Sequence, residues 1–289
     1  MKKIGKILVP TDFSVTARNA YHYATKLAAT LNTSIELVHV TETYVPFPGL
    51  ASHEEVSQDS IDGFNEKAME DFIADDDNNN YEAFGTTVLR NRVTSKTIWG
   101  NVVENLITLS KDTDLIVMGT TGLQDFLSKI MGSISLEVSN KAHCPVLLVP
   151  PDAKWQRISR IMYAGSYSSA TIKMVREVTS LAHSLQSTIH FVHVENSEAD
   201  TEKNVPELLK NRLSLVEGSD FPIEIHTVYD GDTVAGLKKY AVENTINLMV
   251  FVCKPRNFWQ NLIFKSIAED VALSTDTPMM VLHSDDSME

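Results

Sequence analysis

The fold is indicated first by the stretch DLIVMGTTG at residues 114–122, where an apolar run leads into a Gly-x-x-Gly turn. Such a short apolar run is typical of a strand that is covered on both faces. Gly119 and Gly122 let the backbone approach a ligand closely, because glycine has no Cβ and tolerates a positive φ angle. Nine residues later, Gly132 and Ser133 stand at a predicted helix start, where N–H groups and the helix dipole favour an anion. The two segments together predict a phosphate clamp.

The chain contains two copies of one unit. Residues 6–9 (KILV) match residues 160–163 (RIMY), an offset of 154 residues (160 − 6). Further along, residues 115–117 (LIV) match residues 248–250 (LMV), so the offset falls to 133 (248 − 115). The first copy is therefore longer by 21 residues (154 − 133) between its second strand and its later strands. A duplicated unit of this size predicts two domains.

Each copy is predicted to alternate short buried strands with amphipathic helices, such as the one over residues 17–31. Alternation of this kind implies right-handed crossovers and a parallel sheet. We therefore predict an α/β protein with two tandem Rossmann-like domains, over residues 1–150 and 155–289, each a five-stranded, mostly parallel sheet flanked by helices. The insertion in the first copy is predicted to hold a helix at residues 54–73 and a solvated turn at residues 75–80.

Composition narrows the classes of partner. The formal net charge of −13 disfavours binding to nucleic acid or to an anionic membrane, because these carry the same sign. No apolar run reaches the length of a membrane span. The two cysteines are too few for a disulfide framework and are compatible with a reducing cytoplasm. Cys144 has no identifiable partner base and is interpreted as part of the last strand of the first copy.

The motif residues resemble those of the universal stress protein family. The family's nucleotide motif, Gly-x-x-Gly-x(9)-Gly-Ser/Thr, is complete here as Gly119, Gly122, Gly132 and Ser133. The likeness covers nearly the whole chain twice and is similar to the tandem form of the family, whose domains have an adenine nucleotide alpha hydrolase-like fold. Family members with this motif commonly bind ATP. The resemblance therefore implies ATP, with Mg²⁺, in the first domain.

The resemblance also assigns positions around the nucleotide. It places ribose and base near Pro10, Thr11 and Asp12, adenine at the backbone of Val40, ribose and inner phosphates at Met118, Gly119, Thr121 and Gly122, and outer phosphates at Gly132, Ser133, Ile134 and Ser135. Asp12 has a second interpretation, as the N-cap of a helix over residues 14–31, which its spacing favours. Gly119 and Gly122 have the alternative of an ordinary tight turn. The serine hydroxyls are expected to act as donors to phosphate.

The second copy departs from the motif. The positions that correspond to Gly119, Gly122, Gly132, Asp12 and Pro10 hold Val252, Pro255, Lys265, Ser166 and Ala164, and only the motif serine survives, as Ser266. We predict that this domain does not bind ATP. His39 and His193 occupy equivalent strand positions, and because they belong to different domains we expect them to pack or form local hydrogen bonds rather than share a metal.

Three functions remain open on these residues. The first is a cytoplasmic stress-response protein that binds ATP as a regulatory ligand. Its domains would pair within one chain through the last strands, residues 146–149 and 279–282, and a homodimer of tandem chains is a further association compatible with this pattern. The second is a slow ATPase, although no base or arginine finger stands near the motif. The third is an interaction protein that binds no nucleotide.

Overall fold

The computed structural model describes residues 4–42, 58–79, 92–120, 132–165, 172–195, 223–253 and 276–283. The elements of the first half are β1 (Lys6–Thr11), α1 (Val15–Leu31), β2 (Ser34–Thr41), α2 (Gln58–Asn79), β3 (Val93–Trp99), α4 (Val102–Leu109), the 3-10 turn η1 (Ser110–Asp112), β4 (Leu115–Gly119), α5 (Ser133–Lys141) and β5 (Val146–Val149). The elements of the second half are β6 (Arg160–Ala164), α6 (Ile172–Leu185), β7 (Thr188–Glu195), β8 (Ile223–Tyr229), α8 (Thr233–Glu243), β9 (Leu248–Cys253) and β10 (Met279–His283).

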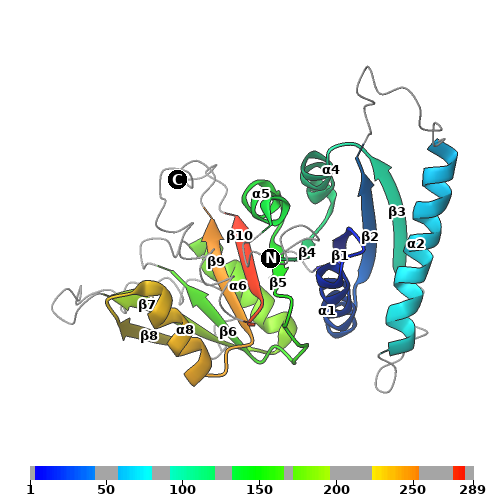
Figure 1. The fold of residues 1–289 in the computed structure, drawn as a ribbon. Helices are drawn as coiled ribbons and strands as arrows, with labels where there is room; N and C mark the ends of the chain where they lie inside the picture. The colour runs from blue at the N-terminus through cyan, green and yellow to red at the C-terminus, as the bar shows by residue number, and fades with distance from the viewer. Residues whose placement is uncertain are drawn as a thin grey trace.

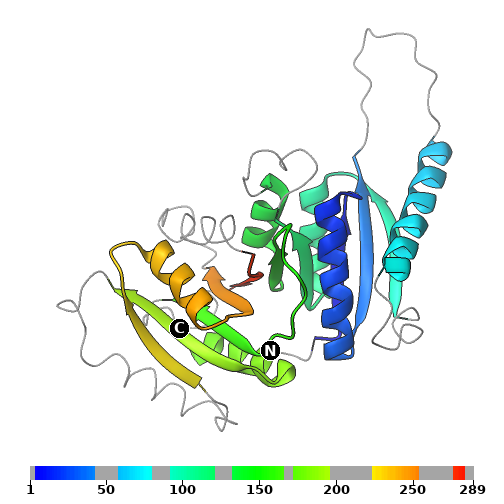
Figure 2. The ribbon, with the colours of Figure 1, turned by 60° about the horizontal axis from the view of Figure 1, so that its bottom comes forward.

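The strands form one ten-stranded sheet in the order β3-β2-β1-β4-β5-β10-β9-β6-β7-β8. Neighbouring strands are parallel within each half, as in the register Ile7↔Ile35 of β1 and β2. The two halves meet where β5 and β10 pair antiparallel, with Leu147 opposite Met280. The first half, coloured blue to green, and the second half, coloured light green to red, accordingly lie side by side (Figures 1 and 2). The predicted α/β class with its parallel sheets is confirmed, and so is the pairing of the last strands.

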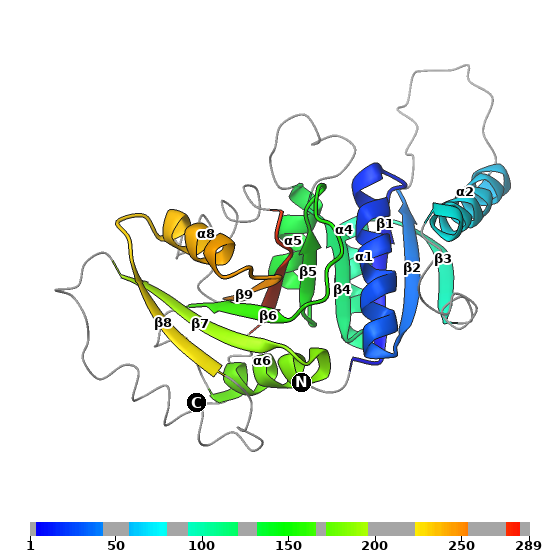
Figure 3. The ribbon, with the colours of Figure 1, turned by 90° about the horizontal axis from the view of Figure 1, so that it is seen from below.

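Helices cover both faces of the sheet because successive strand residues point to opposite sides. Ile7, Val117 and Leu147 lie in one buried cluster with residues of α1, α2 and α6. Leu8 and Ile116 lie in a second cluster with residues of α4, α5 and α8. The strands β1, β4 and β5 each place alternate residues in the two clusters, so most of their residues are apolar. Figure 3 shows the layers in the second half, where α6 and α8 lie on opposite sides of β6 and β7.

The helix α2 lies beside β3 at the outer edge of the first half (Figure 1). Met69 and Phe72 anchor it in the core, and the guanidinium of Arg18 on α1 lies 4.4 Å over the Phe72 ring. The turn predicted at residues 75–80 is wrong over residues 75–79, which continue the helix. Adding residues to an anchored helix requires no new nucleation, so weak helix formers such as aspartate and asparagine can extend it.

Candidate functional site

A cleft of about 410 Å³ lies where β1, β2 and β4 end at their carboxyl ends. Its volume falls in the range of about 300–1,000 Å³ that is usual for small-molecule sites. In an open parallel sheet, ligands bind at this edge. The lining residues come from three strand ends and three helices: Pro10, Thr11, Asp12, Ser14, Ala17, Val38, Val40, Glu42, Val102, Leu106, Met118, Gly119, Gly132, Ser133, Ile134 and Ser135.

The cleft brings together ten of the twelve predicted site residues: Pro10, Thr11, Asp12, Val40, Met118, Gly119, Gly132, Ser133, Ile134 and Ser135. The other two, Thr121 and Gly122, lie outside the described residues. Sequence reasoning missed the wall contributed by α4, which supplies Val102 and Leu106. Their four-residue spacing just after β3 was the available signal, because residues i and i+4 share one helix face.

The turn after β1 is held by its own side chains. Ser14 is the N-cap of α1, since its Oγ accepts from the Ala17 N–H at 3.1 Å. The interpretation of Asp12 as that cap is wrong: its Oδ1 accepts from the Ser14 N–H at 3.0 Å, two residues on. Such an Asx turn orients the chain ahead of a helix without being the cap. The exposed Asp12 therefore stands at the cleft as a turn residue.

Phe13, at the centre of this turn, has a positive φ of 64°. That conformation is uncommon for an aromatic residue and costs on the order of 1–3 kcal/mol, so the surroundings must hold it. The Thr11 Oγ1 accepts from the Phe13 N–H at 3.0 Å, and the Phe13 ring lies 4.4 Å from the ring of His39. The Thr11 side chain and the His39 ring therefore hold the turn in place at the edge of the cleft.

The two strand histidines hydrogen-bond locally, as expected. His39 Nδ1 lies 2.9 Å from the Thr11 carbonyl oxygen, and His193 Nδ1 lies 3.2 Å from the Gly165 carbonyl oxygen. The two contacts are equivalent in the two halves, since Thr11 and Gly165 are 154 residues apart (165 − 11). Each histidine joins the end of one strand to the next strand of the sheet.

The β4 turn and the start of α5 are joined by two hydrogen bonds. The Gly132 N–H donates to the Thr120 carbonyl at 2.8 Å, and the Ser135 hydroxyl donates to the Gly119 carbonyl at 2.8 Å. The expectation that the Ser135 hydroxyl is a donor to phosphate is therefore wrong for this arrangement, because its proton is already used. Both bonds fix the spacing between the two predicted parts of the clamp.

The first turn of α5 presents backbone donors to the cleft. Its N-cap is Gly132, whose carbonyl accepts from the Leu136 N–H at 3.0 Å. Within the described part of the chain, no acceptor is found for the N–H groups of Ser133, Ile134 and Ser135. These groups carry the partial positive charge of a helix N-terminus, which favours an anion. The clustering of donors here agrees with the helix start predicted for the motif.

The charged side chains of the cleft lie on the side opposite to the start of α5. Asp12 follows β1 and Glu42 follows β2, whereas α5 follows β4, which is on the far side of β1 in the strand order. Among the described lining residues, none is lysine or arginine. The cleft therefore offers acceptors near β1 and β2 and backbone donors near β4. Such a division suits a ligand with hydroxyl or amino groups at one end and an anion at the other.

Gly119 lines the cleft and also lies close to the backbone of α1. A Cβ at this position would lie 3.2 Å from the Thr16 carbonyl oxygen in α1. In the second half the corresponding Val252 packs its side chain against the core, and Ala164, which corresponds to Pro10, is buried. The other corresponding positions lie outside the described residues: Ser166, Pro255, Lys265 and Ser266.

Cys144 is a structural residue of the last strand region. It is buried, and its burial raises the pKa of the thiol to about 12. A thiol with such a pKa carries almost no thiolate at neutral pH and is a poor nucleophile. The interpretation of Cys144 as part of the last strand is wrong, because β5 begins at Val146, and Cys144 packs in the core just before it. Across the described residues, no helix has both the length and the apolar character that a membrane crossing requires.

The similarity to known proteins covers both copies of the repeated unit. The model of the universal stress protein family matches residues 3–150 and again residues 157–283. A universal stress protein of Synechocystis is 22% identical over 294 residues, which cover 95% of this chain and 98% of that protein. The structure of a universal stress protein from Archaeoglobus fulgidus covers 98% of this chain and 97% of its own, with a TM-score of 0.68 and 16% identity.

Shorter solved structures overlap about half of the chain. They include a universal stress protein in complex with cAMP, at 18% identity and a TM-score of 0.37, and one from Archaeoglobus fulgidus in complex with dAMP, at 19% identity and a TM-score of 0.34. Two successive matches to one family account for both halves of the ten-stranded sheet. The chain therefore belongs to the universal stress protein family and carries the family's domain twice.

Proposed function

We propose that the half comprising residues 1–150 binds ATP together with Mg²⁺ as a regulatory ligand of a cytoplasmic stress-response protein. The half comprising residues 155–289 is its pseudo-symmetric partner and binds no ATP. The observation that carries the proposal is the cluster of N–H groups at the start of α5, which lies in one cleft with the carboxylates of Asp12 and Glu42.

The different hydrogen-bonding groups at the two ends of the cleft support one orientation of the bound ATP. Phosphates would lie at the N–H groups of Ser133, Ile134 and Ser135, where the helix N-terminus favours negative charge. Ribose and base would lie toward Asp12 and the backbone of Val40, whose oxygen atoms accept hydrogen bonds. Bound Mg²⁺ would neutralise phosphate charge, because the cleft supplies no basic side chain among its described residues.

A single substitution at the α5 N-terminus tests this proposal. Ile134 is 40% exposed, so Ile134→Asp leaves the core intact, and an acidic residue in a first helical turn favours the helix. The new carboxylate repels phosphate, and we expect ATP affinity in equilibrium dialysis with Mg²⁺ to fall at least about tenfold, or about 1.4 kcal/mol. The neutral control Ile134→Asn should bind within about twofold of the wild-type protein.

Two results would overturn the proposal. One is a wild-type protein that does not bind ATP, and the other is equal affinity for the wild-type protein and Ile134→Asp. A time course of ADP release then distinguishes a regulatory binder from a slow ATPase. Release at the rate of a Ser133→Ala control would dispose of the ATPase.

A further inference from the structure

Two histidines and a glutamate lie close together on strands β7 and β8 of the second half. They lie away from the carboxyl ends of these strands, whereas the cleft of the first half lies at the carboxyl ends of its strands. His190 is near the amino end of β7, Glu224 is near the amino end of β8, and His226 is at the middle of β8. In the strand register Glu224 is directly opposite His190, and His226 is two residues further along β8. All three side chains lie on the sheet face that α8 covers, because alternate strand residues share a face.

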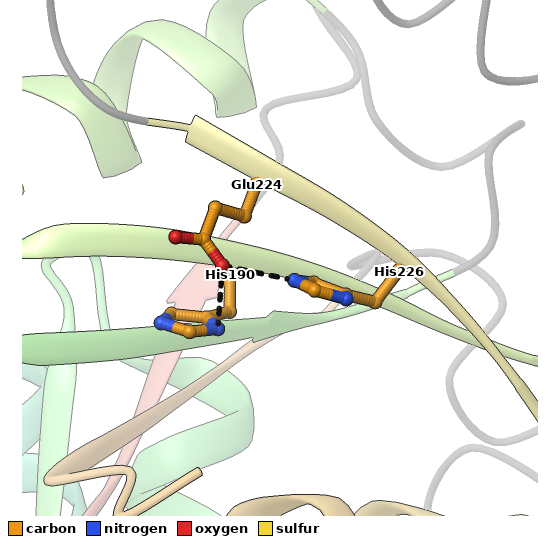
Figure 4. Close-up of side chains that lie close together, drawn as sticks. All are labelled: His190, Glu224 and His226. Atoms are coloured by element: carbon orange, nitrogen blue, oxygen red, sulfur yellow. Dashed lines mark hydrogen bonds and ion pairs between the residues drawn. The ribbon is translucent and has the colours of Figure 1, made fainter.

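The side chains converge on one point. Glu224 Oε2 lies 3.1 Å from His226 Nε2 and 3.7 Å from His190 Nδ1, and one ligand atom from each residue lies within 4.8 Å of the others. In Figure 4 the Glu224 carboxylate lies between the two imidazole rings, with a dashed line to a nitrogen of each. The rings are nearly parallel, 15° apart, with their centroids separated by 5.6 Å.

These distances between the three possible ligand atoms suit a cation with tetrahedral coordination. Zinc binds nitrogen and oxygen ligands at about 2.0–2.2 Å, which places neighbouring ligand atoms about 3.3–3.6 Å apart. The two distances to Glu224 lie on either side of that value, so only the two imidazoles must approach each other further. His190 is buried, and its burial lowers the pKa of the ring. We propose that His190, Glu224 and His226 form a binding site for a divalent transition-metal cation, of which Zn²⁺ is the natural probe.

Surrounding groups complete the environment. The Tyr240 hydroxyl of α8 lies 2.9 Å from His190 Nδ1 and is the fourth polar group at the site. Glu243 and Arg160 line the open depression beside His190, and their charges offset each other. The Arg160 guanidinium is held at the end of α8 by the Asn244 carbonyl at 3.1 Å. A bound cation would exchange the Tyr240 contact for a metal–nitrogen bond and join the edge strand β8 to β7.

The first half provides an internal comparison. Glu36 corresponds to His190 in the repeat (190 − 154), and it forms ion pairs with Lys6 at 2.9 Å and Lys96 at 3.1 Å. Lys6 corresponds to Arg160, and the strand registers place Lys96 where His226 stands in the second half. One copy therefore neutralises this point of the sheet with lysines, whereas the other copy presents two imidazoles and a carboxylate.

Isothermal titration of the full chain with ZnCl₂ tests the site, using protein without a histidine tag that has been freed of metal with a chelator. We expect one Zn²⁺ per chain at this site. Glu224→Gln and His226→Lys should each weaken its binding at least about tenfold, because even groups that only support a metal ligand are worth about 10–100-fold. The side chains of Glu224 and His226 are 53% and 35% exposed, so neither change disturbs the core.

His226→Lys has a further use, because it removes a ligand and puts lysine at the strand position that Lys96 occupies in the first half. The exposed His183 on α6 gives the matched control, since His183→Gln removes an imidazole elsewhere and should leave zinc affinity unchanged. The proposal is overturned if the wild-type chain binds no zinc, or binds it no more tightly than Glu224→Gln and His226→Lys. ATP binding is measured separately, so failure of either proposal is recognised independently.

Discussion

Gly119 illustrates how a single position can serve packing and a candidate site together. A side chain there would meet the backbone of α1 at Thr16, with 3.2 Å to the carbonyl oxygen and 3.3 Å to the carbonyl carbon. Backbone atoms cannot move aside as a flexible side chain can. An added Cβ would therefore require α1 and β4 to move apart by a few tenths of an ångström, whatever occupies the cleft.

Gly119→Ala should lower the free energy of unfolding by about 1–3 kcal/mol, the usual effect of overpacking. Gly63→Ala is the matched control in α2, where an added Cβ meets nothing within 4 Å. That control should raise stability by about 0.5–1 kcal/mol, because alanine favours a helix more than glycine. Urea denaturation gives both values from the transition midpoints. Equal effects of the two substitutions would contradict the packing role of Gly119.

Residue types and spacing predicted which strand ends meet at the cleft, because the carboxyl ends of parallel strands lie at one edge, and the family resemblance supplied most of the individual lining residues. They did not predict which side chain caps α1, since Asp12 and Ser14 are both good caps and the backbone angles of the turn decide between them. Nor did they reveal that the Ser135 proton is used by Gly119, since that bond joins segments 16 residues apart. Contacts of this kind depend on tertiary placement.

Among the elements, β2 carries an ionised side chain, Glu36, between the buried residues Ile35 and Leu37. Glu36 forms its ion pairs with Lys6 on β1 and Lys96 on β3, so one carboxylate links three strands. Burial alone would raise the pKa of Glu36, but the contacts with Lys6 and Lys96 outweigh burial and lower it. The three strands are therefore most strongly linked when Glu36 is ionised.

Glu36→Gln should lower the free energy of unfolding at pH 7 by about 0.5–1 kcal/mol, since both lysines are partly exposed. The folded-state pKa lies below the free value of 4.5, so the contribution is complete above that pH and is lost as pH falls through the folded-state pKa. Urea denaturation of both proteins between pH 7 and pH 3 measures the difference. A difference that stays constant over this range would contradict the ionic contribution of Glu36.

Periodicity predicted the strands and the helices well, because each buried face needs its own repeat. It placed the end of α2 too early, since the local preference of residues 75–79 for a turn was weaker than continuation from the anchored turns before them. The helices expected between β7 and β8 and between β9 and β10 lie outside the described residues. Segment ends are decided by packing that sequence patterns do not record.

For the molecule as a whole, the connector between the halves is attached to α1. The Asn19 Nδ2 group donates to three carbonyls of the connector, those of Pro150 at 2.9 Å, Pro151 at 3.2 Å and Ala153 at 3.1 Å. Trp155 packs edge-on against Tyr23 of α1, 4.8 Å between ring centroids. Pro150 and Pro151 stiffen the connector, because proline fixes its own φ angle, but the attachment of the connector to α1 could not be read from the sequence.

Asn19→Ala should lower the free energy of unfolding by about 0.5–1.5 kcal/mol, because it removes the amide donor from the part-buried carbonyls of Pro151 and Ala153, whereas the Pro150 carbonyl still accepts from the Ala153 N–H. Thr30→Ala is the control on the same helix, where the exposed threonine hydroxyl donates to the carbonyl of Lys26, and it should change stability by less than about 0.5 kcal/mol. Circular dichroism during urea denaturation reports both. An Asn19→Ala protein as stable as the control would show that the connector is not held by this amide.

The antiparallel pairing of β5 with β10 has a consequence for how the protein responds to dilution. Both strands belong to one polypeptide, so the contact forms by a unimolecular step and is not subject to mass action. A contact of the same kind between two separate chains would dissociate as the protein becomes scarce. Here each half has its partner at a fixed effective concentration set by the short connector, and the ratio of the two halves is always one to one.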